Sequence, residues 1–337
     1  MSFLNRARLY SALPLSIRQA AVSVLGYRNR RIRYGKHFLD QRQLLEQSQY
    51  WSPDQMLEYQ ARKLSSLLHE ARSFTIAYNH LPVLILDEIR EMLANHDFSP
   101  LPILTKADLR SRTEHYRNRS RDAAAVGSTS GTTGSPMRNE RDRESVGRTF
   151  AFLAQQRNWL GITEASPSVR LSGRQIVPIS KNFPPYWLYN SAENQLFLST
   201  YHLTKTTAGP IADKLHRFRP ELIDGYPSAI LELGRILGPR ARIPSLKAII
   251  TTAETLHDSD RELLTKMFDV PVLDYYAASE GIPLIQQCEK GSYHIRPESG
   301  IFEILDENNM EVAPGETGEL VVTSFCNFRT ILIRYKT

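Results

Sequence analysis

The sequence contains little cysteine and no long apolar run. Two cysteines among 337 residues, Cys288 and Cys326, are too few for the disulfide framework of a small secreted scaffold, so they indicate a reducing compartment. No stretch of about 18 apolar residues is present, and residues 1–10 lack the apolar core of a secretory signal. We therefore expect a cytoplasmic protein.

Signatures of nucleic-acid binding are also missing. The chain has neither a zinc-finger spacing nor an aromatic RNA-binding motif, so no nucleic-acid partner is expected. The formal net charge of +6 is nevertheless uneven. Basic residues crowd the first segment, namely Arg6, Arg8, Arg18, Arg28, Arg30, Arg31, Arg33 and Lys36. Such a segment is more often a solvated helical face, and the alternative is peripheral contact with an anionic membrane surface.

The pattern of apolar residues predicts an α/β fold. Apolar residues make up 41% of the chain and charged residues 23%, as in ordinary globular proteins. Short apolar runs alternate with helical stretches, which predicts layered α/β sheets. The expected strands are 123–126, 246–250 and 270–275, and the expected helices are 143–160, 208–218, 229–237 and 259–267. Strand-like runs at 293–295, 301–306, 319–323 and 330–335 predict a small β-rich subdomain at the C-terminal end.

Helices are also expected in the first part of the chain. Residues 9–35 carry apolar side chains at roughly helical spacing, and we interpret residues 1–50 as a basic helical extension. Ser52 and Pro53 form a typical helix start, and an apolar stripe follows them. After a proline-containing connector, Thr105 can cap another helix.

The most informative segment is rich in glycine and hydroxyl side chains. Residues 127–136 read Gly-Ser-Thr-Ser-Gly-Thr-Thr-Gly-Ser-Pro. Backbone N–H groups can approach an anion closely where side chains are this small, and the hydroxyls add donors. Such composition usually marks a flexible linker, but a predicted strand before it and a helix after it favour a phosphate-binding loop. The Walker pattern is absent, because no Gly-Lys-Ser/Thr follows at the required spacing.

Two segments resemble the adenylate-forming acyl-CoA synthetases. Residues 130–136 resemble that family's phosphate-binding signature, which implies that Ser130, Gly131, Thr132, Thr133 and Gly134 contact ATP phosphates. Residues 274–281 read Asp-Tyr-Tyr-Ala-Ala-Ser-Glu-Gly and resemble its Tyr-Gly-x-Ser/Thr-Glu motif, with alanine replacing the usual glycine. Without the resemblance, this second segment would be the end of a buried strand.

The resemblance assigns a role to each residue of the second motif. It implies that Tyr276 lies against the adenine, that Ser279 meets the α-phosphate and that Glu280 helps hold Mg²⁺. Aromatic faces stack on bases and carboxylates suit a hard cation. Ser279 and Glu280 are therefore the expected catalytic residues.

Further segments narrow the resemblance to the phenylacetate-CoA ligase group. Residues 101–109 resemble that group, and residues 199–203 and 224–228 resemble its members tied to capsular polysaccharide loci. The turn containing Ala253 and Glu254 resembles one that borders the adenine site.

A weaker assignment concerns the acyl group. The order of segments in the family implies that Tyr201 and His202 face the acyl pocket. A lone histidine is more often a hydrogen-bonded structural residue.

The resemblance implies an activity together with a fold. The fold is the large N-terminal domain of the superfamily, with an α/β core over 51–285 and an incomplete β-rich subdomain over 286–337. Residues 333–337 resemble the family's Ile-Arg-Tyr-x-Thr-Gly-Asp segment, and the sequence stops where Gly-Asp and then a C-terminal lid domain would follow. The implied reaction is ATP-dependent, AMP-forming activation of a carboxylic acid, followed by transfer to CoA or another acceptor. We expect it to be incomplete in this chain, and the alternative is a noncatalytic nucleotide-binding or scaffolding remnant in a polysaccharide-biosynthesis system.

The two cysteines lie in the β-rich end beside His294. Cys-x₅-His followed by Cys326 can supply three tetrahedral Zn²⁺ ligands, with Glu298 as a fourth. The spacing is not a standard zinc signature, and two packed free thiols are the more usual outcome. Structural Zn²⁺ is therefore a separate hypothesis, in addition to the ATP, Mg²⁺ and CoA that the resemblance implies.

Overall fold

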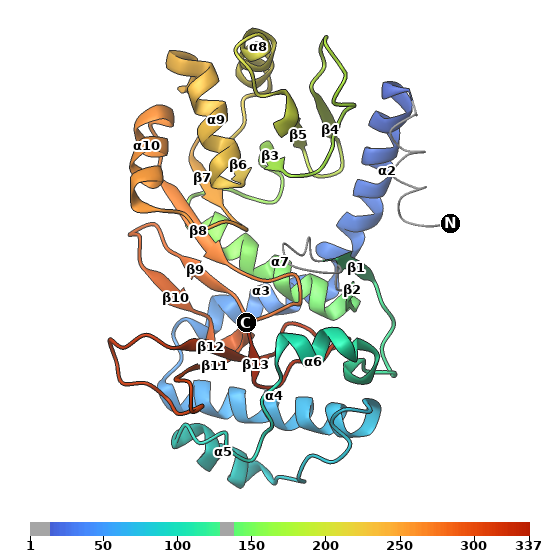
Figure 1. Cartoon of the computed structure of the whole chain (residues 1–337), viewed down its shortest axis with the longest axis vertical. Helices are drawn as coiled ribbons and strands as arrows, with labels where there is room; N and C mark the ends of the chain where they lie inside the picture. The colour runs from blue at the N-terminus through green and yellow to red at the C-terminus, as the bar shows by residue number, and fades with distance from the viewer. Residues whose placement is uncertain (1–13, 129–137) are drawn as a thin grey trace. The chain divides into compact units, whose positions relative to one another are not determined.

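The computed structural model describes residues 14–128 and 138–337, which form two compact units (Figure 1). Unit 1 contains the described residues up to Arg31, with 156–276 and 286–293. Unit 2 contains residues 32–155, 277–285 and 294–337. Each unit is therefore assembled from separate stretches of chain.

A large mixed sheet is the centre of unit 1, with the strand order β10-β9-β8-β7-β6-β3-β5-β4. Strands β3, β5, β6, β7 and β8 run parallel, and β4 pairs antiparallel with β5. The strands are β3 (Ser168–Ser172), β4 (Trp187–Asn190), β5 (Gln195–Ser199), β6 (Leu222–Gly225), β7 (Ala248–Thr251), β8 (Val272–Tyr276), β9 (Ile285–Gln287) and β10 (Tyr293–Ile295). The predicted layered α/β class is confirmed.

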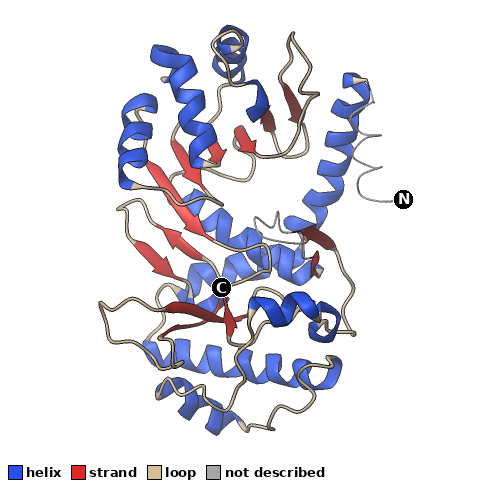
Figure 2. Cartoon of the chain, in the orientation of Figure 1, coloured by secondary structure: helices blue, strands red, loops and turns tan. Residues whose placement is uncertain are grey.

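Three helices of unit 1 share their core with the sheet (Figure 2). They are α8 (Ala208–Phe218), α9 (Pro227–Leu237) and α10 (Asp258–Phe268). Ile223 and Ile249 on the strands are completely buried against Ile211, Ile230 and Leu264 on these helices. The sequence predicted all three helices, because their apolar residues recur at helical spacing.

A longer helix, α2 (Leu15–Arg33), lies along β4 through side-chain hydrogen bonds. The Gln19 amide donates to the carbonyl of Tyr189, whose N–H donates back to Gln19 Oε1 at 2.9 Å. The hydroxyl of Ser23 accepts from the N–H of Ser191 at 3.3 Å. Because β4 is the last strand of the sheet, its outer edge has backbone N–H and C=O groups that do not pair with another described strand. The side chains of α2 bond to some of these groups.

The same helix continues along the turn that follows β4. Arg30 donates to the carbonyl of Ala192 at 2.6 Å. A Cβ atom at Gly26 would lie 2.1 Å from Oδ1 of Asn190, so only glycine permits this close approach. Among the described residues, no helix is both long enough and apolar enough to cross a membrane.

Helices and a small sheet make up unit 2. The helices are α3 (Lys36–Ser48), α4 (Pro53–Phe74), α5 (Leu86–Ala94), α6 (Lys106–Ser111) and most of α7 (Arg143–Asn158). The antiparallel sheet is β11 (Gly300–Leu305), β12 (Glu319–Ser324) and β13 (Tyr335–Lys336), which confirms the predicted small sheet near the C-terminus. Both predicted helix caps are present: Ser52 accepts from the N–H of Gln55, and Thr105 from the N–H of Asp108.

The prediction of a strand over 330–335 is wrong, because strand β13 covers only Tyr335–Lys336 and Thr330 makes just an isolated bridge with Arg117. Arg334 has a φ of +44°, in the left-handed region that β-strands do not use. Its carbonyl accepts from the N–H of Leu104 at 3.0 Å, and its guanidinium donates to the carbonyls of Phe98 and Leu101. This stretch therefore holds the connector before α6 instead of extending the sheet.

Candidate active site

The hydroxyl-rich segment connects the two strands of a hairpin in unit 2. Strand β1 (Ala125–Ser128) pairs antiparallel with β2 (Arg138–Arg141), and residues 129–137 between them lie outside the described residues. The predicted phosphate contacts of Ser130, Gly131, Thr132, Thr133 and Gly134 are therefore not placed. The described chain stops before them at Ser128 on β1 and resumes after them at Arg138 on β2.

The predicted catalytic residues are hydrogen-bonded to the strand that leaves this segment. The buried amide of Asn139 on β2 donates to Ser279 Oγ at 3.1 Å, and Ser279 Oγ donates to Glu280 Oε2 at 3.2 Å. The Asn327 amide donates to the carbonyls of Glu140 and Glu280, at 3.2 and 2.8 Å. Two segments that are far apart in the sequence are thus held together beside the hairpin.

Glu280 is a buried carboxylate, with 2% of its surface exposed. Its Oε1 lies 3.6 Å from the ammonium of Lys106 and 3.5 Å from the hydroxyl of Tyr335. A buried charge requires such partners. Lys106 and Tyr335 belong to segments that resemble the family, but no sequence pattern predicts that either side chain will lie beside Glu280.

The oxygen atoms around Glu280 fit one side of a Mg²⁺ site. The carboxylate and the Ser279 hydroxyl are hard oxygen ligands. Within residues 14–128 and 138–337, no group of three or more His, Cys, Asp or Glu side chains is arranged to hold a metal ion. Mg²⁺ commonly takes one or two carboxylates and completes its shell with substrate phosphates and water, so a lone carboxylate suits a nucleotide-bound ion.

The zinc hypothesis finds no support in the described structure, where the predicted ligands form no metal-binding group. Cys288 is a half-buried thiol of unit 1, whereas Cys326 is fully buried in unit 2 and donates to the carbonyl of Ser299. His294 is exposed, and the Glu298 carboxylate already accepts from the Ser48 hydroxyl at 2.5 Å. Cys326 therefore matches the alternative of a packed thiol.

The two thiols are expected to differ in reactivity. Burial raises the pKa of the Cys326 thiol to about 11, so at pH 8 it is almost entirely protonated as well as inaccessible. We expect iodoacetamide at pH 8 to alkylate Cys288 in the native protein and both cysteines in urea. Peptide mass spectrometry measures this, and rapid native alkylation of Cys326 would contradict the packing described here.

The adenine-site residues of unit 1 follow neighbouring parallel strands at their carboxyl ends. Tyr276 is the last residue of β8 and is 40% exposed, while Ala253 and Glu254 come after β7. Ligands of α/β sheets commonly bind at this edge. Glu254 accepts from the N–H and hydroxyl of Ser228, at 3.2 and 3.0 Å, at the start of α9. Ala253 has a φ of +69°, a strained conformation typical of functional turns.

Buried charges hold β6 in place beside these turns. Asp224 accepts from Arg157 at 3.0 Å and from Arg170 at 3.1 Å. The neighbouring Asp224 carboxylate raises the pKa of Arg170, which keeps this guanidinium charged. Asp224, the first residue of the segment 224–228 that resembles the family, therefore has a structural role.

Gly225 ends β6 with a φ of +151°, and a Cβ atom there would lie 2.0 Å from the carbonyl oxygen of Leu171. We expect Gly225→Ala to lower the free energy of unfolding by about 2–3 kcal/mol, because β3 and β6 must separate locally. Urea unfolding measures the change. Gly209→Ala is the control, because a Cβ there meets no atom within 4 Å. Equal stability of the two variants would contradict the close approach.

The residues predicted for the acyl pocket have different environments. Tyr201 is exposed, and its hydroxyl donates to the carbonyl of Gly173 at 3.2 Å. His202 is buried, stacks on Tyr186 with ring centroids 5.1 Å apart, and shares a hydrogen bond of 2.8 Å with the Ser199 hydroxyl through Nδ1. This packing is typical of a hydrogen-bonded structural histidine, the alternative given for His202 in the sequence analysis.

Comparisons with known proteins agree with the fold. No family model matches the chain. Protein CapK of Staphylococcus aureus is 28% identical over 330 residues, which are 97% of this chain and 71% of CapK. The human mitochondrial acyl-coenzyme A synthetase ACSM5 is 26% identical over 232 residues, which are 65% of this chain but only 39% of that enzyme.

A solved structure gives the structural likeness. The 2-hydroxyisobutyryl-CoA ligase in complex with 2-HIB-AMP and CoA superposes with a TM-score of 0.61 at 16% identity, over 85% of this chain and 63% of the ligase. The chain thus spans less than two thirds of that enzyme and mainly its N-terminal domain. The chain is therefore a homologue of Protein CapK and shares the fold of this CoA ligase over most of its length.

Proposed function

We propose that the chain binds ATP with Mg²⁺ and supports the AMP-forming activation of a carboxylic acid, as in the phenylacetate-CoA ligase group. The observation that carries the proposal is the hydrogen-bonded series from Asn139 through Ser279 to Glu280. It joins the strand that leaves the hydroxyl-rich segment to a buried carboxylate. A phosphate-binding segment next to a magnesium ligand is the arrangement that nucleotide chemistry requires.

Each residue has a distinct task in the proposed reaction. Backbone and hydroxyl donors of residues 130–134 bind the β- and γ-phosphates, the Ser279 hydroxyl orients the α-phosphate, and Tyr276 stacks on the adenine. When bound, Mg²⁺ offsets the negative charge of the phosphates, and Glu280 would hold it. The substrate carboxylate oxygen bonds to the α-phosphorus while the bond to pyrophosphate breaks, which leaves an acyl-adenylate. Transfer of the acyl group to CoA or another acceptor would follow.

The phosphate contacts can be tested by substituting two hydroxyls. We expect Thr132→Ala combined with Thr133→Ala to weaken ATP binding about tenfold or more, because hydrogen bonds to a charged group are lost. Isothermal titration calorimetry with MgATP measures the affinity. Thr206→Ala is a matched control, because Thr206 is exposed elsewhere in the chain. Unchanged affinity of the double variant would refute the assignment.

A second measurement separates an enzyme from a noncatalytic remnant. Pyrophosphate release is measured with ATP, Mg²⁺ and a panel of carboxylic acids. Release that depends on one class of acid supports activation. ATP binding without such release by any acid would favour a nucleotide-binding or scaffolding role.

A further inference from the structure

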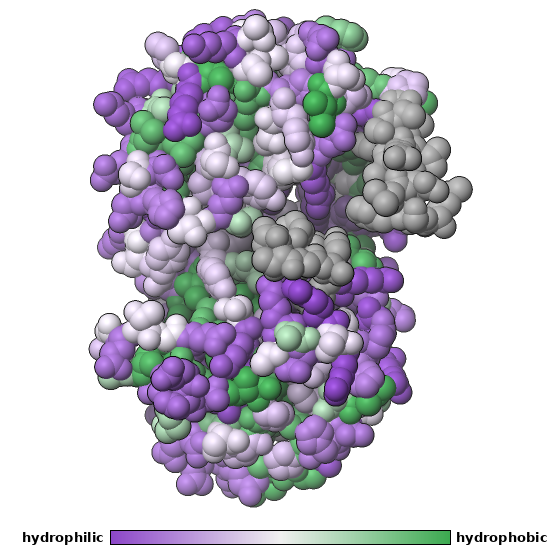
Figure 3. All heavy atoms as spheres, viewed as in Figure 1, coloured by the Kyte–Doolittle hydropathy of each residue, from purple (hydrophilic) through white to green (hydrophobic). Residues whose placement is uncertain are grey.

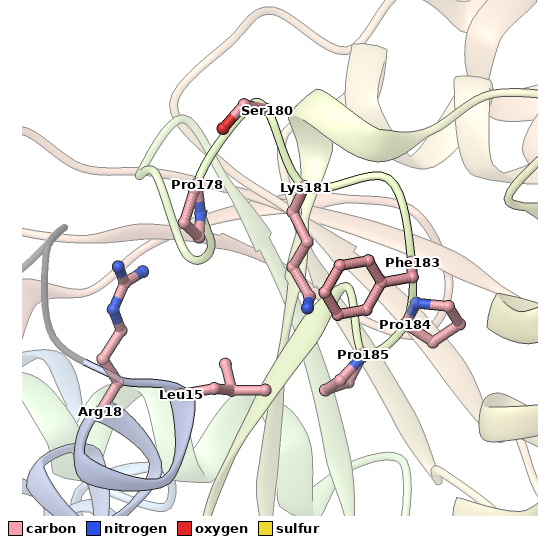
Figure 4. A pocket seen from close by; sticks show the side chains of 8 residues that line it. All are labelled: Leu15, Arg18, Pro178, Ser180, Lys181, Phe183, Pro184 and Pro185. Carbon is pink, nitrogen blue, oxygen red and sulfur yellow. The ribbon is translucent and has the colours of Figure 1, made fainter.

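Helix α2 and the segment 178–185 line a cavity of about 510 Å³ within unit 1 (Figure 4). Two cationic side chains extend into it from opposite sides. Arg18 reaches from the helix toward Pro178, and Lys181 reaches from the segment toward the helix. The ammonium of Lys181 lies 3.7 Å from the centre of the Phe183 ring, which places a charge beside an apolar wall. Such a cavity suits an anionic group attached to an apolar body.

Large apolar side chains are exposed on the two segments that line this cavity. Ile179 and Phe183 are 58% and 67% exposed on the segment itself, and Ile17 and Val24 are 49% and 68% exposed on α2. On the face of the protein shown in Figure 3, hydrophilic residues dominate and hydrophobic residues lie in small groups between them. Clustered exposed apolar residues are therefore informative, because they mark an interaction surface more often than isolated ones do.

The outward side of α2 combines apolar and basic residues. Ile17, Val24, Arg28 and Arg31 are exposed and recur at helical spacing, so they share one side of the helix. This side is opposite the polar side chains that bond to β4. The helix thus exposes Ile17 and Val24 to solvent together with basic residues, while Gln19 and Ser23 bond to β4.

The two segments that line the cavity contain basic residues and no acidic ones. Residues 14–39 contain no Asp or Glu, and neither do residues 165–192. The two stretches meet at the cavity, so basic side chains are not offset by acids of their own segments. A partner with a dense negative charge and an accessible apolar layer complements them, and an anionic lipid bilayer has both properties.

We propose that α2 and residues 178–185 form a docking surface for membranes that contain anionic lipids. Arg28 and Arg31 face the headgroup phosphates, and the tips of Val24, Ile179 and Phe183 enter the interface between headgroups and acyl chains. Arg18 and Lys181 receive a lipid phosphate in the cavity. The inference is independent of ATP binding, since none of these residues belongs to the proposed active site.

Vesicle sedimentation with the full chain tests the proposal. We use vesicles of phosphatidylcholine alone, and of phosphatidylcholine with phosphatidylglycerol at about 7:3. We expect binding to the anionic vesicles only, and we expect added salt to weaken it. Arg28→Glu with Arg31→Glu should reduce the bound fraction at least tenfold, whereas Lys266→Glu with Lys290→Glu, an equal charge change elsewhere in unit 1, should not.

A second pair of variants tests apolar insertion. Ile179→Ser with Phe183→Ser changes two exposed side chains, so folding is expected to survive, and anionic-vesicle binding should fall about tenfold. Met310→Ser is the exposed apolar control. The proposal would be overturned if the native chain bound both vesicle types equally or bound neither. It would also be overturned if both double variants bound anionic vesicles as well as the native chain does. A change from dimer to monomer in these variants would overturn it too, and would identify the surface as a contact between two copies of the chain.

Discussion

Replacing Arg334 with methionine is expected to lower the free energy of unfolding by about 3–5 kcal/mol. The guanidinium and the Glu303 carboxylate are both buried, and three nitrogen-to-oxygen distances between them are 2.8 to 3.2 Å. The same guanidinium donates to the carbonyls of Phe98 and Leu101. Removing it leaves a buried carboxylate without its ionic partner and takes one donor away from each of these carbonyls.

The pKa of Glu303 explains why removing Arg334 alone is expected to destabilise the protein. Burial raises the pKa of this carboxyl, and Arg334 opposes the rise. Without Arg334 the carboxyl would take up a proton more readily, so the variant should lose stability as the pH rises from the ordinary pKa of a glutamate to the raised pKa of the folded state. Glu303→Leu combined with Arg334→Met should recover part of the loss, because both buried charges are then removed.

Hydrogen exchange can localise this effect to unit 2. Mass spectrometry of peptides that contain residues 98–104 and 300–305 should show faster exchange in the Arg334→Met variant. Lys336→Met is the control, because its partly exposed pair with Glu319 is worth less than about 1 kcal/mol. Native exchange rates in both peptides would show that Arg334 does not hold the connector.

Replacing Glu280 with glutamine is expected to abolish most of the effect of Mg²⁺ on ATP binding. The amide keeps the size of the side chain but offers the ion no negative charge. We expect a loss of about a hundredfold in carboxylate-dependent pyrophosphate release, as when one stabilising group is removed from a charged transition state. Folding should be retained, because the partner Lys106 is half exposed and can be hydrated.

Calorimetric titration of ATP with and without Mg²⁺ checks this result directly. The native chain should gain affinity when Mg²⁺ is added, and the Glu280→Gln variant should not. Glu289→Gln, at an exposed position, should behave like the native chain. An undiminished Mg²⁺ effect in the Glu280→Gln variant would show that the ion is held elsewhere.

Much of the fold could be predicted because local signals agreed with it. The start of α4 was identified from Ser52 and Pro53, and both caps formed as the residue types require. Helix α8 was predicted with its observed ends because its apolar residues keep one spacing throughout. The family resemblance then supplied the order of the motifs, which local patterns could not.

The interactions that long-range packing decides were not predictable. Nothing in the sequence around Lys106 shows that it will face Glu280, because 174 residues separate them along the chain. The left-handed backbone of Arg334 could not be read from an apolar run that otherwise resembles a strand. Helix α3 lies within the predicted helical extension 1–50 but was not recognised as a separate helix, since its few apolar residues give only a weak periodic signal.

The hydrogen bonds between α2 and β4 bear on how the chain folds as it is synthesised. Gln19 and Tyr189 are 170 residues apart, so the ribosome completes the helix long before its partner strand exists. Unit 1 also needs residues 286–293, and it therefore cannot close until most of the chain has emerged. During that interval α2 exposes both its polar and its apolar side. Such a chain assembles late, because α2, the first of the described helices to be synthesised, is among the last elements to reach its place.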